Sequence, residues 1–179
     1  MESIYNNLTQ DQRQSADQLF SRALQCTKNN DMVGAANYYH QSADMGHPGA
    51  QDNFGNQYKN GRGVNRDPQE AVRLFTLSAK QGSVFGMRNL ASCYMDGIGV
   101  DVNFDLAVDW LETAAEQKDN LACAMLAKAY DNWNHKDDEK RFFGIRKLQS
   151  MEMLTVCLHW ASIMVKRRQS RFTSCIKLL

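Results

Sequence analysis

The residues of this sequence that most readily do chemistry are its cysteines and histidines. Both types bind zinc, and both take part in nucleophilic catalysis, but only when the fold or a short spacing brings them together. The five cysteines contain no CxxC pair, and no Cys–His group has zinc-ligand spacing; they are Cys26, Cys93, Cys123, Cys157 and Cys175. The four histidines are scattered as well, at His40, His47, His135 and His159. We therefore expect no metal site and no cofactor, and we interpret the cysteines as buried free thiols in a reducing compartment.

Motifs of known catalytic mechanism are also missing from the sequence. There is no G-x-S-x-G nucleophile elbow, no phosphate-binding loop and no H-E-x-x-H zinc motif. Two G-x-G pairs do occur, one at Gly61 and Gly63 and one at Gly97 and Gly99. Both pairs lack the third glycine of a dinucleotide-binding turn, and neither follows a strand pattern. The sequence thus predicts no catalytic residues and a protein that is not an enzyme.

The bulk composition narrows the class of protein further. The chain has 179 residues, 43% of them hydrophobic and 23% charged, which is typical of a folded domain with a core. Its net charge of +1 argues against a nucleic-acid partner, which usually demands a strong basic excess. The first residues, MESIYNNLTQDQ, do not resemble a signal peptide, and no stretch reaches the roughly 20 apolar residues of a membrane span. A cytoplasmic location is expected, and a membrane partner is not.

An internal repeat explains the two G-x-G pairs. Residues 47–82 align with residues 83–118 without a gap, so identical residues recur 36 positions apart. The matched pairs are Tyr58 with Tyr94, Gly61 with Gly97, Gly63 with Gly99, Val64 with Val100, Ala71 with Ala107 and Ala79 with Ala115. A fixed period of this length is typical of solenoid proteins.

Each block predicts two helices joined by a turn. Ala50, Phe54 and Tyr58 stand four residues apart and so share one face of a first helix. The glycines that follow permit a reversal of the chain. Asp67, and Asn103 in the next block, then offers an oxygen that caps the second helix. Such a hairpin buries its apolar face only against neighbouring hairpins, which predicts a stacked solenoid.

The two blocks resemble the Sel1-like repeat, a relative of the tetratricopeptide repeat. The matching segments are AQDNFGNQYKNGRGVNRDPQEAVRLFTLSAKQG and GMRNLASCYMDGIGVDVNFDLAVDWLETAAEQK. The resemblance implies an all-α fold, a right-handed α-solenoid of stacked helix-turn-helix repeats with a C-terminal capping helix. It also implies a non-enzymatic protein–protein interaction module that acts as an adaptor or scaffold. The first repeat lacks the G-x-G-V turn, so its loop is expected to be shorter.

On this basis the whole chain, residues 1–179, is predicted to be a single repeat domain. Its expected parts are a divergent N-terminal repeat or cap (1–46), two full repeats (47–82 and 83–118), a partial repeat and loop (119–147), a capping helix (148–168) and a basic tail (169–179).

By analogy with tetratricopeptide grooves, the resemblance implies that the first helix of each hairpin lines a concave face. The predicted partner-binding residues on that face are Asp52, Asn56, Lys59, Phe85, Arg88, Ser92, Met95 and Lys128. A protein or peptide partner is expected there, although Phe85 could instead pack against the neighbouring repeat. The sequence makes no prediction of the oligomeric state.

Two alternatives remain open for the C-terminal part of the chain. One is a small-ligand or enzymatic site between the last repeat and the C-terminal helix, formed by Trp133, His135, His159 and Trp160. The other is association of the basic tail with a membrane surface through Lys166, Arg167, Arg168, Arg171 and Lys177.

Overall fold

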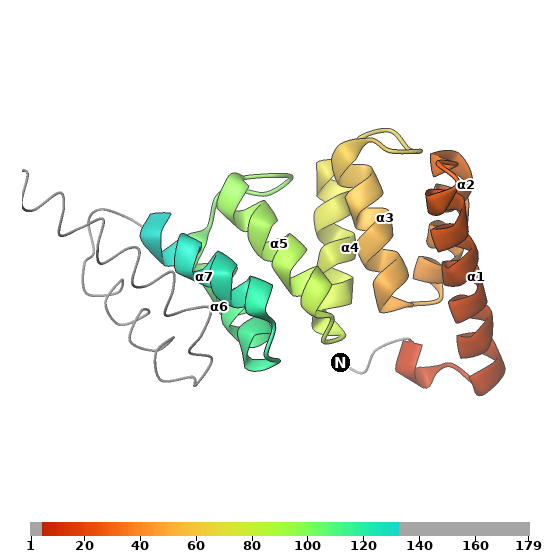
Figure 1. The fold of residues 1–179 in the computed structure, drawn as a ribbon, viewed down its shortest axis with the longest axis horizontal. Helices are drawn as coiled ribbons and strands as arrows, with labels where there is room; N and C mark the ends of the chain where they lie inside the picture. Colours follow the sequence, from red (N-terminus) through yellow and green to blue (C-terminus); the bar gives the residue numbers. More distant parts are fainter. Residues whose placement is uncertain (1–4, 133–179) are drawn as a thin grey trace, which may run out of the picture. The chain divides into compact units, whose positions relative to one another are not determined.

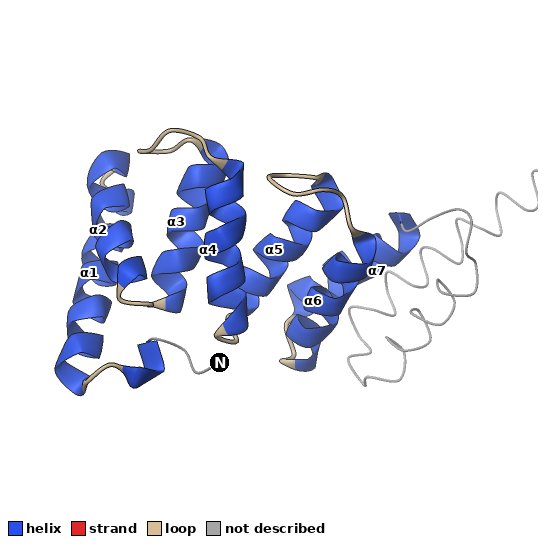
Figure 2. Cartoon of the chain, turned by 180° about the vertical axis from the view of Figure 1, so that it is seen from behind, coloured by secondary structure: helices blue, strands red, loops and turns tan. Residues whose placement is uncertain are grey.

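The computed structural model describes residues 5–132, apart from four side chains in the last helix (residues 127 and 130–132). Within this range every regular element is a helix and no strand occurs, so the prediction of an all-α chain is confirmed (Figures 1 and 2). The elements are a 3-10 turn η1 (Tyr5–Asn7), α1 (Gln10–Lys28), α2 (Met32–Asp44), α3 (Pro48–Asn60), α4 (Pro68–Lys80), α5 (Val84–Asp96), α6 (Phe104–Glu116) and α7 (Asn120–Asn132). The predicted capping helix and basic tail lie outside the described residues, as does the loop from residue 133 on.

The chain divides into two compact units, residues 1–110 and 111–179, and the division falls inside α6. In the first unit each helix packs on the next from α1 to α5. In addition, α3 contacts α5, the first helix of the following hairpin. In the second unit the described core is made of small and medium side chains on α6 and α7. The fully or almost fully buried ones are Leu111, Ala114, Ala115, Ala122, Cys123, Leu126 and Ala129.

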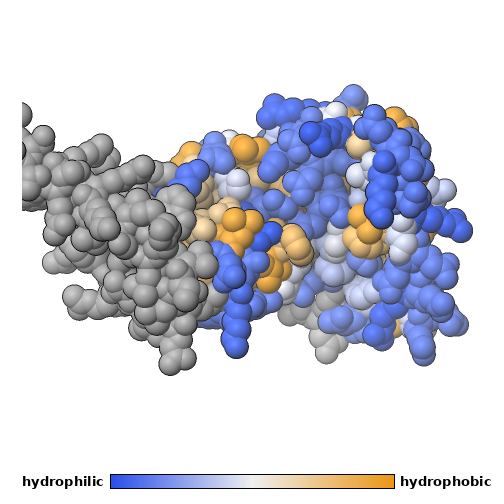
Figure 3. All heavy atoms as spheres, in the orientation of Figure 1, coloured by the Kyte–Doolittle hydropathy of each residue, from blue (hydrophilic) through white to orange (hydrophobic). Residues whose placement is uncertain are grey.

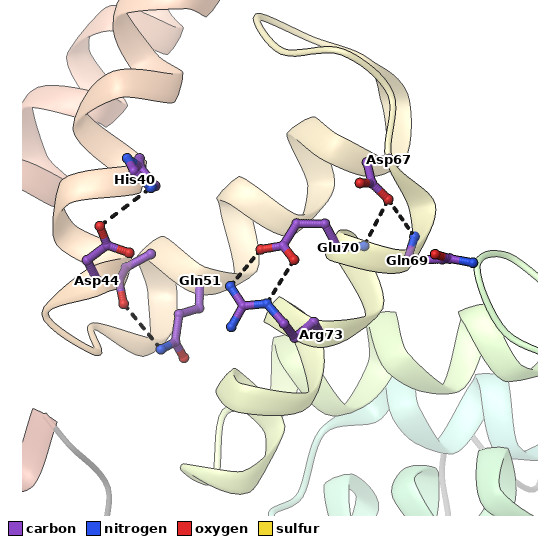
Figure 4. A network of polar contacts seen from close by, with 8 residues as sticks. His40, Asp44, Gln51, Asp67, Gln69, Glu70 and Arg73 are labelled. Atoms are coloured by element: carbon purple, nitrogen blue, oxygen red, sulfur yellow. Dashed lines mark hydrogen bonds and ion pairs between the residues drawn. The ribbon is translucent and has the colours of Figure 1, made fainter.

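Local sequence sets where the helices of the second hairpin begin and end. Gly61 ends α3 in the left-handed region at φ 67°, a conformation that is strained for residues with a Cβ. Asp67 then starts α4, because its carboxylate accepts the backbone N–H groups of Gln69 and Glu70, each at 3.1 Å. The cap and the adjacent Glu70–Arg73 ion pair are drawn in Figure 4.

The turn glycines also bring neighbouring hairpins close together. A Cβ on Gly63 would collide with the backbone carbonyl of Met32, the first residue of α2. A Cβ on Gly99 would collide in the same way with the carbonyl of Pro68, the first residue of α4. Each long loop therefore lies against the start of the second helix of the preceding hairpin, as Figure 1 shows for the loop between α3 and α4.

The first hairpin joins its two helices, α1 and α2, by a shorter turn. Asn30 takes a positive φ of 61° between α1 and α2, and Asp31 caps α2 by accepting the N–H of Gly34 at 2.8 Å. Asparagine tolerates the left-handed region better than other non-glycine residues, which is why this turn needs no glycine.

Small residues and one buried hydroxyl hold each of the first two hairpins together. Ser42 Oγ donates to the carbonyl of Ala16 at 2.8 Å, and Ser78 Oγ donates to the carbonyl of Pro48 at 3.0 Å. Both serines are completely buried, and they lie 36 residues apart, which is one repeat. An equivalent bond therefore joins the two helices within each of these hairpins. The core around α2, α3 and α4 consists mainly of alanines with Tyr39, Phe54 and Leu74. The alanines let the helices pack closely, and three polar side chains of α3 are buried with them: Gln51, Asp52 and Gln57.

Candidate functional site

The best candidate site of the first unit is the outer surface of α3 and α5, the first helices of successive hairpins. We call it the first-helix face and define it by Asn56, Lys59, Phe85, Arg88, Ser92 and Met95. All six side chains are at least partly exposed. Figure 3 shows hydrophobic side chains gathered over α5, whereas the surface over α3 and α4 is mostly hydrophilic. The face therefore combines apolar and polar groups on two helices that contact each other.

Phe85 is the most exposed large hydrophobic residue of the described chain. Its relative exposure is 65%, so it does not pack into the neighbouring repeat, which was the alternative that the sequence left open. The guanidinium carbon of Arg88, one turn later on α5, lies 4.9 Å from the centre of the ring. A cation over an aromatic face is attracted by the ring quadrupole. The result is an aromatic group beside a cation, with most of its surface in water.

Asp52 does not belong to the exposed surface, and its prediction as an outward residue is wrong. It is only 5% exposed and lies beneath the face, between α3 and α5. Its Oδ1 accepts a hydrogen bond of 3.1 Å from Nδ2 of Asn89 on α5. Burial raises the pKa of the Asp52 carboxyl from 3.8 to about 6, against the opposing effects of the Asn89 bond and of the charges of Arg88 and Lys59. Stacking of the next hairpin causes this burial.

The remaining polar members of the face have local partners. Asn56 Nδ2 donates to the carbonyl of Asp52 at 3.1 Å, and Ser92 Oγ donates to Oδ2 of Asp96 at 3.2 Å. Lys59 extends its ammonium to 5.8 Å from the centre of the Phe75 ring. The side chain of Met95 is half-buried beside them on α5. Together these contacts order the face without covering it.

Lys128, also predicted to bind a partner, belongs to the second unit. It is exposed on α7. The candidates for a ligand site or membrane contact, Trp133, His135, His159, Trp160 and the basic tail, lie outside the described residues. In residues 5–132, no three His, Cys, Asp or Glu side chains are grouped as a metal site would require. In the same range, no helix is both long enough and apolar enough to cross a membrane.

Sequence reasoning missed two polar features of the first unit. Asn89 bonds the buried Asp52, and no periodic signal marks it. The second feature surrounds His47, whose Nδ1 accepts the N–H of Ala50 at 3.1 Å and thereby caps α3. His47 Nε2 lies 3.4 Å from Oδ1 of Asp17, which also accepts a hydrogen bond from the hydroxyl of Tyr5. Position 47 precedes a helix and is aligned with Ser83, a cap of the usual type, so the cap itself could have been found.

The His47 cluster is a structural junction between the N-terminal segment, α1 and α3. The imidazole stacks on Phe20 with ring centres 4.4 Å apart, and the edge of Tyr5 approaches it at 5.4 Å. Burial lowers the pKa of His47 below its usual 6.5. Burial, together with the bond to Asp17, raises the pKa of Tyr5 to about 12. These groups hold η1 in place.

Comparison with known proteins shows which repeat family the sequence matches. The model of the Sel1 repeat matches residues 18–47, 49–83 and 84–119. An uncharacterized protein of Neisseria meningitidis serogroup B is 33% identical over 97 residues, which are 54% of this chain and 20% of that protein. An exopolysaccharide production negative regulator of Rhizobium leguminosarum is 31% identical over 100 residues, which are 50% of this chain and 38% of that protein. The chain thus spans well under half the length of these relatives.

A solved structure shows the same kind of fold. It is a protective antigen of uropathogenic Escherichia coli strains, described as displaying an SLR fold. The similarity has a TM-score of 0.69 at 27% identity, and it covers 84% of this chain and 34% of the antigen.

Proposed function

Because the chain belongs to the Sel1 repeat family, we propose that it is a non-enzymatic adaptor that binds a protein partner through the first-helix face. Sel1 repeats generally mediate contacts between proteins, and their fold is typically an interaction scaffold rather than a catalyst. The relative from Rhizobium is named a negative regulator, a kind of role that binding alone can fill.

The observation that carries the proposal is the exposed Phe85 ring beneath Arg88. Aromatic and arginine side chains supply most of the binding energy at many protein interfaces. Asn56, Lys59 and Ser92 add partly exposed polar groups further along the same face, and polar groups are usual at the rim of an interface.

A cytoplasmic location is part of the same proposal. The described cysteines, Cys26, Cys93 and Cys123, are all free thiols, which supports a reducing compartment. Burial raises the pKa of Cys93 to about 11, so this thiol stays protonated and unreactive.

The proposal is tested by affinity capture from extract with Phe85→Asp and a matched control, Val33→Asp. Val33 is 63% exposed, close to the 65% of Phe85, and each residue is the second of its helix. Aspartate near a helix start is favourable to stability, so both variants should fold, which melting curves verify. We expect wild type and Val33→Asp to retain a common partner that Phe85→Asp loses. If Phe85→Asp retains every partner of the wild type, the first-helix face is not the binding surface.

A further inference from the structure

A buried carboxylate lies directly beneath the first-helix face. Asp52 projects from α3 toward α5, where Asn89 donates to it, and it is almost completely removed from solvent. Burial of a carboxyl group disfavours its ionised form, so this position is costly to the folded chain at neutral pH. A buried ionisable group at an exposed apolar surface is a candidate for a functional role.

The charges around this carboxylate are positive. The groups that act on it in the described part of the chain are Arg88, from α5, and Lys59, from α3, whereas α2 and α4, which also pack on α3, contribute no charged group to it. Asn89, its hydrogen-bond donor, is neutral. Arg88 and Lys59 are both partly exposed, whereas the Asp52 carboxylate is buried. The side chains that a partner meets at this point are therefore cations beside an aromatic ring.

We propose that the first-helix face takes an acidic protein segment with an apolar side chain, and that binding is accompanied by the uptake of a proton at Asp52. This proposal rests on the function proposed above. The apolar side chain covers Phe85, and the carboxylates of the segment lie near Lys59 and Arg88. A partner carboxylate placed over these cations also comes close to the Asp52 carboxylate.

Electrostatic coupling gives the proton uptake its sign. A like charge disfavours the ionised form of Asp52, so the bound state holds its proton more tightly than the free state. Binding must then strengthen as pH falls, by the same factor as the shift in proton affinity. A rise of about one unit in the pKa of Asp52 on binding corresponds to about tenfold in affinity. A basic segment would have the opposite effect and would release a proton.

The experiment uses the full chain and peptides selected on it from a random display library at about pH 5.5, where the carboxylates of the peptides are ionised and Asp52 is largely protonated. Peptide composition is compared with the unselected library. Affinity is then measured at about pH 5.5 and about pH 8, and proton exchange is measured by titration calorimetry in buffers of different ionisation enthalpy. The variants are Asp52→Asn, which is isosteric and cannot ionise, and the pair Phe85→Asp and Val33→Asp.

We expect the selected peptides to be enriched in Asp or Glu together with aromatic or aliphatic residues, and to lose binding in Phe85→Asp but not in Val33→Asp. Wild type should bind them with proton uptake and with about tenfold lower affinity at the higher pH. Asp52→Asn should bind them with no proton uptake and with less than about a twofold change.

The possible failures are distinguishable. Peptides that need Phe85 but are basic or uncharged, or that bind wild type without proton uptake, overturn this inference and leave the adaptor function standing. If proton uptake persists in Asp52→Asn, another group is responsible and the inference is also overturned. If no selected peptide depends on Phe85, the proposed function fails together with the inference.

Discussion

Replacement of Asp52 by asparagine should stabilise the folded chain at neutral and alkaline pH. The substitution keeps the shape of the side chain and an oxygen that can accept the Asn89 bond, but it removes the charge. A carboxyl group whose pKa rises on folding binds its proton more tightly in the folded state. Its favourable contribution is therefore complete below the pKa of 3.8 of the unfolded chain and is lost as pH rises through about 6.

The size of the effect follows from the two pKa values. The rise from 3.8 to about 6 is roughly two units, which is about 3 kcal/mol between the fully protonated and the fully ionised limits. Because Asp52 is only 5% exposed, solvent screening reduces this figure little. Between about pH 4.5 and about pH 8 the unfolded chain is already mostly ionised, so about 2 kcal/mol of the difference remains observable.

The assay is urea unfolding followed by circular dichroism at both pH values. We expect the stability of Asp52→Asn relative to wild type to increase by about 2 kcal/mol from the lower pH to the higher one. Asp101→Asn is the matched control, because Asp101 is exposed in the loop between α5 and α6, and its relative stability should stay nearly constant. A difference between Asp52→Asn and wild type that is the same at both pH values would refute the reasoning.

Three further tests of the fold use four substitutions. Gly99→Ala should cost about twice as much unfolding free energy as Gly82→Ala, which itself costs about 1 kcal/mol. Both glycines have positive φ, but only a Cβ at position 99 meets another backbone, so equal losses in urea unfolding would contradict the close approach. His47→Ser should gain stability relative to wild type as pH falls from about 7.5 to about 5.5. Protonated His47 cannot accept the N–H of Ala50. Because its pKa is lowered on folding, the stability that neutral His47 contributes is lost as pH falls. A serine cap does not titrate between these pH values. Ser78→Ala should lower the free energy of unfolding by about 1 kcal/mol, and no change in the urea midpoint would show that the buried bond to Pro48 contributes nothing.

The hairpins could be read from the sequence because their signals are local. A glycine at positive φ and an aspartate before a proline act on neighbouring backbone atoms. Gly61 and Asp67 therefore indicate the end of α3 and the start of α4 from the local sequence alone. The exposure of Phe85 was left open by the sequence, because the pattern of one helix does not say whether the neighbouring repeat covers this ring.

The burial of Asp52 could not be predicted in this way. The stripe through Ala50 and Phe54 places Asp52 on the outer side of α3, and that assignment holds for an isolated hairpin. The next hairpin covers the residue because α5 contacts α3, and Asn89 compensates part of the cost. Helical periodicity describes one helix at a time, whereas this site depends on how successive hairpins stack.

Each long loop of the first unit contacts the hairpin before it in the chain, so these contacts all run from a later segment to an earlier one. The loop that contains Gly63 needs the start of α2, and the loop that contains Gly99 needs the start of α4. In both cases the supporting helix is synthesised first, so the surface that receives each loop can already be folded when the loop leaves the ribosome. For these two loops, shortening the chain from its N-terminus removes the helix that each loop contacts, while shortening it from the C-terminus leaves that helix in place. Each of these loops thus depends on a helix that precedes it in the chain.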